Sequence, residues 1–186
     1  MPASPESLAA GRAYQHSLLA ALGDNDPAVT QAAQPAILRT LIADAGDDLR
    51  TRPEPGEWSV VELIGHIVDA ELNSSVRYRS ILAHDEPDLV PYDQDLWANR
   101  LHSTSDSVDD LLALFDALRA ANLHLWAATP GADRARVGNH LERGPESYEL
   151  TFRLLAGHDR VHLAQAQAGL ARIRARQSAP GDPNRS

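Results

Sequence analysis

Apolar residues recur at helical spacing along most of this chain, and no segment shows a sustained alternation of apolar and polar residues. Amphipathic helices repeat their apolar positions every three or four residues, whereas half-buried strands repeat them every two. Alanine and leucine are abundant and aromatic residues make up only 5%, which also favours helix over sheet. The sequence therefore predicts an all-α fold without a substantial sheet.

The clearest helix start is at Ser59, because Ser59 and Glu62 match a capping box that satisfies free backbone N–H groups. This helix is predicted to end near Ala83. Prolines and glycines mark the starts and ends of the other predicted helices. They predict further helices over about 5–22, 34–52, 107–129 and 146–175.

Prolines at 87 and 91 exclude a continuous helix over residues 85–93. Long amphipathic helices with connections of varied length are typical of an antiparallel four-helix bundle, here with an N-terminal helical extension. We expect a single domain over residues 1–176. The composition of residues 177–186 predicts a disordered tail.

The chain has 186 residues, of which 26 are acidic and 17 basic, giving a formal net charge of −9. Polyanions repel an acidic protein, so we expect no nucleic-acid partner and no binding to anionic membranes. Arg77 and Arg79 could meet an anionic substrate, although exposed arginines on a helix are usually only solvated. Cysteine is absent, so any thiol chemistry needs a thiol that arrives on a small molecule.

No apolar run approaches the roughly 20 residues of a membrane-spanning helix. The first residues lead directly into a polar stretch and show no signal-peptide pattern. A cytoplasmic location is therefore expected.

Three histidines form the pattern that most directly suggests chemistry. His158 and His162 are spaced i and i+4, so both lie on one side of the 146–175 helix, within its apolar stripe. His66 lies at the edge of the inward face of the 59–83 helix. Three neutral imidazoles from two helices could hold a metal and leave positions open for water or substrate. Hydrogen bonds or bridging water could also satisfy buried histidines, so the pattern alone leaves both explanations open.

Two other classes of metal site share part of this pattern. The segment from His158 to His162 resembles the His-Glu-x-x-His motif of zinc peptidases, with Asp159 at the position of the glutamate that acts as the base. The shorter aspartate weakens this alternative without excluding it. A di-iron bundle would need Glu-x-x-His from two helices, and the sequence offers only Asp159-x-x-His162. The other histidines are expected on the surface or in loops: His16, His84, His102, His124 and His140.

Four segments together resemble the DinB-like (YfiT-type) superfamily, and the resemblance covers about residues 14–170. They are PGEWSVVELIGHIVDAE at 55–71, DQDLWA at 93–98, GNHLERG at 138–144 and AGHDRVHLAQ at 156–165. The resemblance implies a DinB-type four-helix bundle that is often a homodimer. It also implies a divalent transition metal held by His66, His158 and His162, with Zn or Ni preferred and Fe, Mn or Co as alternatives.

The resemblance leaves several activities open, since relatives include metal-dependent hydrolases and enzymes that use low-molecular-weight thiols such as bacillithiol, mycothiol or glutathione. We expect a metal-dependent enzyme that activates a small-molecule thiol for attack on an electrophile, in the manner of a thiol S-transferase. The alternatives are a hydrolase that uses a metal-bound hydroxide, and a non-enzymatic, stress-associated metal-binding protein.

Candidate catalytic residues lie close to the three histidines in the sequence. Asp69, Asp159 and Glu62 could orient ligands or move protons. His140 is expected in the loop that enters the last helix, where it could line the pocket or stabilise the loop through a hydrogen bond.

Overall fold

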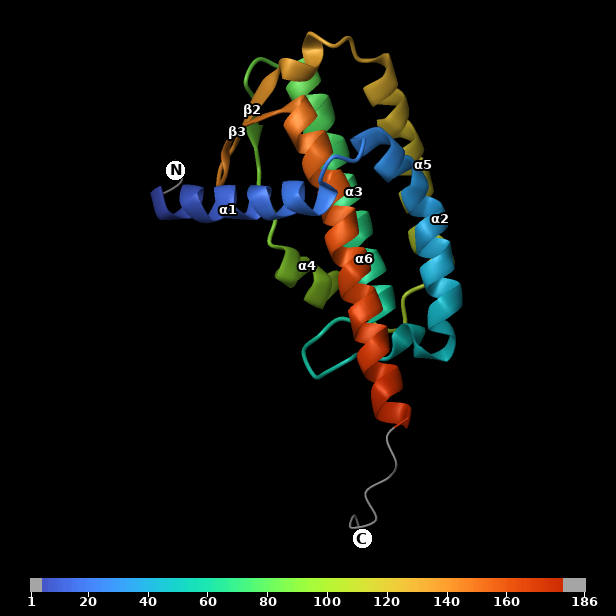
Figure 1. Cartoon of the computed structure of the whole chain (residues 1–186). Helices are drawn as coiled ribbons and strands as arrows, with labels where there is room; N and C mark the ends of the chain where they lie inside the picture. Colours follow the sequence, from blue (N-terminus) through green and yellow to red (C-terminus); the bar gives the residue numbers. More distant parts are fainter. Residues whose placement is uncertain (1–4, 179–186) are drawn as a thin grey trace.

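The computed structural model describes residues 5–178, which form a four-helix bundle with an additional crossing helix and a small sheet (Figure 1). The helices of the bundle are α2 (Pro27–Ala45), α3 (Val60–Ala83), α5 (Val108–Ala128) and α6 (Tyr148–Ser178). Each packs on two neighbours, so that the order around the bundle is α2, α6, α3 and α5. The predicted all-α, four-helix-bundle fold is confirmed.

Helix α3 begins at the capping box that the sequence predicts. The Glu62 carboxylate accepts a hydrogen bond from the backbone N–H of Ser59 at 2.9 Å and forms an ion pair with Arg52. Burial raises the pKa of Glu62, but the contacts with Arg52 and Ser59 outweigh this effect. The pKa is therefore held below its ordinary value. The observed contacts of the Glu62 carboxylate are therefore structural: they cap the start of α3 and pair with Arg52. The helix ends at Ala83, as predicted.

The predicted start of α2 near residue 34 is wrong, because the helix begins at Pro27 and continues through Pro35. The Asp26 carboxylate caps two backbone N–H groups of the first turn at 2.8 and 2.9 Å. Pro35 has no N–H to donate to the carbonyl of Gln31, which normally breaks a helix. Arg119 on α5 donates to this carbonyl instead, at 3.1 Å. A contact from a distant part of the chain thus supports a proline inside α2.

The apolar core has two parts. One lies among all four helices of the bundle and includes Leu38, Ile64, Phe115 and Leu170. The other lies toward the sheet and is built around aromatic side chains: Tyr78, Tyr148 and Phe152. Full burial of one such side chain stabilises the fold by about 1.5–3 kcal/mol, so packing of these stripes accounts for most of the bundle's stability.

Helix α1 (Pro5–Leu22) has the predicted bounds and crosses α6 at a steep angle (Figure 1). The two helices approach most closely at Gly157. A Cβ atom at this position would lie 2.0 Å from the carbonyl oxygen of Leu18, so only glycine permits the contact. His158 follows directly, which means that the crossing brings α1 next to the paired histidines.

The described residues contain only a small sheet, whose strand order is β1, β2, β3. Strands β2 (Val137–His140) and β3 (Gly144–Ser147) form an antiparallel hairpin, and β1 (Asp88–Leu89) pairs with β2 in parallel. These strands are too short to show an alternating pattern in the sequence. The sheet places His140 at the end of β2.

Two further segments differ from the predicted helices. A short helix, α4 (Gln94–Leu101), follows the proline-containing segment and is capped by Asp93, a feature that the sequence analysis missed. Helix α6 includes residues 177 and 178, and the remainder of the predicted disordered tail lies outside the described residues. Between residues 5 and 178, no helix has both the length and the apolar character needed to cross a membrane.

Candidate metal centre

Three histidine side chains meet in the interior of the bundle. His66 on α3 places its Nε2 atom 3.0 Å from Nε2 of His158 and 3.2 Å from Nε2 of His162, both on α6. All three residues are buried. The Trp58 ring, which precedes α3, packs against the His66 ring with centroids 5.1 Å apart. The spatial cluster that the sequence pattern predicts is therefore present in the fold.

Burial keeps the three imidazoles neutral. Desolvation, followed by the neighbouring histidines, lowers the pKa of His66 to about 3 and that of His158 well below its ordinary value. Desolvation also lowers the pKa of His162. The amide oxygen of Gln165 lies 2.8 Å from Nδ1 of His162, and an amide oxygen can only accept a hydrogen bond. Nδ1 therefore carries the proton, and Nε2 of His162 presents a lone pair.

The donor set fits a bound cation. Two nitrogen atoms bound to one ion at about 2.0–2.1 Å lie about 2.8–3.4 Å apart for bond angles of about 90–110°. The observed separations of 3.0 and 3.2 Å fall in this range. Nδ1 of His66 and Nδ1 of His158 are buried without a hydrogen-bond partner among residues 5–178. An ion at Nε2 would place the proton of each ring on Nδ1, so the fit rests on the Nε2 separations and not on these two atoms.

A cavity of about 560 Å³ opens beside the cluster and is lined by His158. Helix α1, the exposed end of the β2–β3 hairpin and the segment before α4 enclose it against α3 and α6. The cavity also reaches His140, one of the candidate catalytic residues. Its size suits a small molecule, since ligand pockets typically measure about 300–1,000 Å³.

Asp159 and Asp69, the candidate catalytic carboxylates, are held by partners from other helices. Asp159 is fully buried, and its Oδ2 accepts a hydrogen bond from Arg119 on α5 at 2.8 Å. Asp69 Oδ2 lies 2.8 Å from Nε2 of His102. Neither residue lines the cavity in the described part of the chain. Their catalytic roles stay predictions, and their observed contacts are structural.

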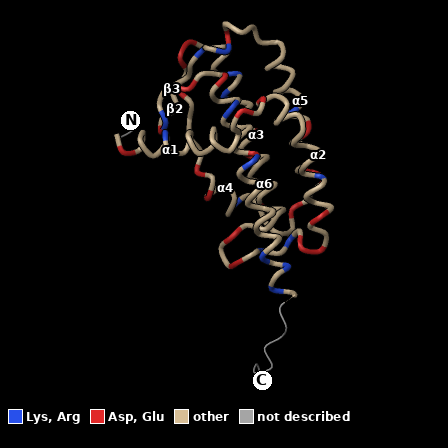
Figure 2. The backbone as a smooth tube through the Cα atoms, viewed as in Figure 1, with Lys and Arg blue, Asp and Glu red and all other residues tan. Residues whose placement is uncertain are grey.

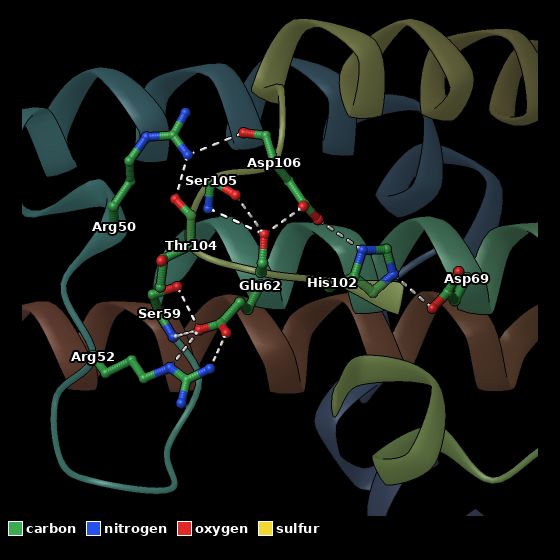
Figure 3. A network of polar contacts seen from close by, with 10 residues as sticks. Arg50, Arg52, Ser59, Glu62, Asp69, His102, Thr104, Ser105 and Asp106 are labelled. Atoms are coloured by element: carbon green, nitrogen blue, oxygen red, sulfur yellow. Dashed lines mark hydrogen bonds and ion pairs between the residues drawn. The ribbon is translucent and has the colours of Figure 1, made fainter. Parts of the chain in front are cut away.

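His102 joins two carboxylates from different segments, Asp69 and Asp106 (Figure 3). Its Nε2 atom faces Asp69 on α3, and its Nδ1 atom faces Asp106 at 3.0 Å in the segment before α5. The ring lies directly on Gly65, where a Cβ atom would come within 2.4 Å of it. Hydrogen bonds from the ring, first to Asp69, raise the pKa of His102 above 6.5. A ring that donates to two carboxylates at once must be protonated.

We expect His102→Gln to destabilise the protein in a pH-dependent way. Because the pKa of His102 is raised in the folded state, its stabilising effect is complete below about pH 6.5 and is lost as pH rises through the folded-state pKa. The difference in unfolding free energy from wild type should be about 1–3 kcal/mol at about pH 6 and much smaller at about pH 9. Urea unfolding of metal-free protein at both pH values measures it. His16→Gln, at an exposed position on α1, is the control, and an equal loss at both pH values would contradict the assignment.

Two features of this region were missed in the sequence. His102 lies in the connection after α4, in agreement with the expected surface or loop position, but its contact with Asp69 was not foreseen, and Arg119 was not singled out. His102 follows α4, a helix that was not predicted. Arg119 occupies an ordinary position in a leucine-rich segment, so no local signal in the sequence indicates that it is buried. Asp69, which contacts His102, and Asp159, which contacts Arg119, are 33 and 40 residues away in the chain.

Comparison with known proteins places this fold and site in a family. A profile of the DinB superfamily matches residues 7–166. A Bacillus mycoides (strain KBAB4) protein named "Putative metal-dependent hydrolase" is 30% identical over 109 residues, which are 59% of this chain and 62% of that protein. An Oceanobacillus iheyensis protein with the same description is 28% identical over 131 residues, 70% of this chain and 76% of that protein.

A solved structure shares the fold. YfiT from Bacillus subtilis, described as a probable metal-dependent hydrolase with an unusual four-helix bundle topology, superposes with a TM-score of 0.72 at 22% sequence identity. The match covers 80% of this chain and 86% of that structure. The alignments to the Bacillus relatives span only about three fifths of their length. The family profile, in contrast, extends over most of the present sequence, and the chain therefore belongs to the DinB superfamily.

Proposed function

We propose that this protein is a metal-dependent enzyme in which His66, His158 and His162 hold one divalent transition metal and a small-molecule thiol is the nucleophile. The observation that carries the proposal is the meeting of three buried Nε2 atoms next to a cavity that one of the three residues, His158, lines. The names of the relatives, which describe metal-dependent proteins, support it. Nitrogen ligands suit Zn or Ni best, with Fe, Mn or Co as alternatives.

When bound, such an ion supplies Lewis acidity that lowers the pKa of a coordinated thiol or water. The protein's own residues set the conditions for this chemistry. Neutral imidazoles add no charge, so the cation keeps its full attraction for an anionic nucleophile. Gln165 fixes the orientation of His162 through its Nδ1 atom. Packing of Trp58 against His66 fixes the third ring.

The composition and the cavity are compatible with a thiol that comes from solution. The chain has no cysteine, so a thiol nucleophile has to enter from solution. The cavity beside His158 has room for a small thiol or its electrophilic partner. His140 reaches this cavity, and its Nδ1 atom accepts the backbone N–H of Glu142 at 3.2 Å. The proton of this neutral ring is therefore on Nε2, so His140 serves as a hydrogen-bond donor to a bound molecule.

Hydrolysis by an activated water is the second candidate, and the names of the relatives favour it. A metal-binding protein without turnover is the third. The homodimer and the cytoplasmic location stay predictions. The substrate classes, a thiol and an electrophile, are part of this proposal.

An activity assay separates the three candidates. Protein loaded with Zn or Ni is incubated with monochlorobimane in the presence and absence of low-molecular-weight thiols, and in parallel with a simple aryl ester. We expect thiol-dependent loss of monochlorobimane that disappears in His66→Ala and persists in His124→Ala, which alters an exposed histidine of α5. Ester hydrolysis that depends on His66 but not on thiol would assign the hydrolase instead. Metal binding without either activity would contradict an enzymatic role.

A further inference from the structure

The cavity beside His158 contains a cation without a counter-ion. Arg77 on α3 lines the cavity, and no carboxylate within residues 5–178 forms an ion pair with it. Its Nη2 atom donates to the carbonyl of Val90 at 3.2 Å, while its Nε atom is buried without a hydrogen-bond partner. Desolvation, followed by repulsion from Arg143, lowers the pKa of Arg77. Arg77 is half-buried, and even partial desolvation of an unpaired charge is unfavourable unless a partner compensates it.

Two other hydrogen-bond donors share the wall of this cavity. His140 is buried, and its Nε2 atom, which carries the proton, has no partner in the described part of the chain. Arg143, in the turn between β2 and β3, is held in place by the buried Glu146, with Nη2 to Oε2 at 3.0 Å. Arg77 and Arg143 both lower the pKa of His140, to about 3, after desolvation, which is the larger cause. All three side chains line the same cavity, and all present positive or donor groups.

The acidic residues of the cavity wall do not neutralise these donors. The Asp93 carboxylate caps α4 by accepting the N–H of Leu96 at 2.8 Å. Glu142 is exposed at the rim. Figure 2 shows basic segments on α3 and near the β2–β3 hairpin, within a chain whose formal net charge is −9. Glu146 neutralises Arg143, so Arg77 and the Nε2–H group of His140 are the two donors of this group without an anionic partner in the described part of the chain. Unpaired donors on a cavity wall of an acidic protein indicate selection of an anion at this point, because the overall charge attracts none.

We propose that this cavity binds a small molecule through an anionic oxygen group, a carboxylate or a phosphate, with Arg77 as its principal anchor and Arg143 and His140 beside it. The guanidinium presents a planar fork whose Nε–H and Nη–H groups match the two oxygens of either group. As a statement about substrate recognition, this inference rests on the proposed function. It states that the thiol or the electrophile carries an anionic group, bound on the wall of the cavity that His158 also lines.

Anion binding is tested on metal-free full-length protein by isothermal titration calorimetry. Succinate and inorganic phosphate serve as probes, at an ionic strength held constant with chloride. We expect saturable binding of at least one probe at millimolar concentration to wild type. Arg77→Gln should weaken it at least tenfold, which corresponds to about 1.4 kcal/mol. Binding of succinate alone assigns a carboxylate, and binding of phosphate alone assigns a phosphate.

Arg79→Gln is the matched control, because Arg79 lies on the same helix but donates to Asn122 at 2.9 Å and does not line the cavity. Its affinity should stay within twofold of wild type. Arg77→Lys keeps the charge but lacks the Nε–H donor of the guanidinium, so its affinity should fall severalfold. If Arg77→Gln does not fold, Arg77→Lys provides the test. Absence of saturable binding to wild type, or unchanged affinity in both Arg77 variants, would overturn the anion site. Since no metal is present, neither result depends on the proposed metal centre.

Discussion

The double variant His158→Ala/His162→Ala is expected to lose its bound transition metal completely, while wild type retains about one ion per chain. Each histidine provides one of three converging Nε2 atoms. Removal of two leaves only His66, and a single buried imidazole cannot hold a divalent ion against water. Elemental analysis of both proteins, purified in parallel and again after reconstitution with Zn, Ni and Mn, measures the effect.

The surface variant His124→Ala controls for non-specific binding of metal to histidine and should retain the wild-type content. Circular dichroism of the double variant checks that the helices persist. Wild-type protein that stays free of metal after reconstitution with all three ions would contradict the metal centre. The convergence of three buried histidines would then need another explanation, as would the unpaired Nδ1 atoms of His66 and His158.

Local signals in the sequence predict most helices of this bundle. The capping box at Ser59 and Glu62 gives the start of α3, and Gly23 gives the end of α1, because these residues act within one turn of the chain. The start of α2 is different. Pro35 normally excludes helix, and the compensating hydrogen bond to Gln31 comes from Arg119, 88 residues away. No local pattern contains that information.

The candidate metal centre was predictable for a related reason. The i,i+4 spacing of His158 and His162 defines a common face, and the resemblance to the DinB-like superfamily added His66. The surroundings were not predictable, since the partners of Asp69 and Asp159 come from other helices. The cavity itself depends on the crossing of α1 over Gly157, a tertiary contact that leaves only a glycine in the sequence.

Arg119 is the residue whose loss should destabilise the fold most. It is almost completely buried on α5, with Nε donating to Glu71 at 3.0 Å and Nη1 donating to Asp159 at 2.8 Å. Burial raises the pKa values of Glu71 and Asp159, and the guanidinium opposes this effect in both. The cationic side chain therefore favours the ionised forms of both buried acids, and it also supports α2 at the Gln31 carbonyl.

Arg119→Met is expected to lower the unfolding free energy by about 3–5 kcal/mol, since it leaves two buried carboxyl groups without their cation. Urea unfolding of metal-free protein at about pH 7 measures the loss. The control Arg39→Met breaks an exposed ion pair with Asp116 and should leave the unfolding free energy close to that of wild type. In the variant, the pKa values of both acids rise further in the folded state, so folding takes up protons. The loss should therefore shrink as pH falls toward about 5, and a loss that is independent of pH would show that packing alone accounts for the role of Arg119.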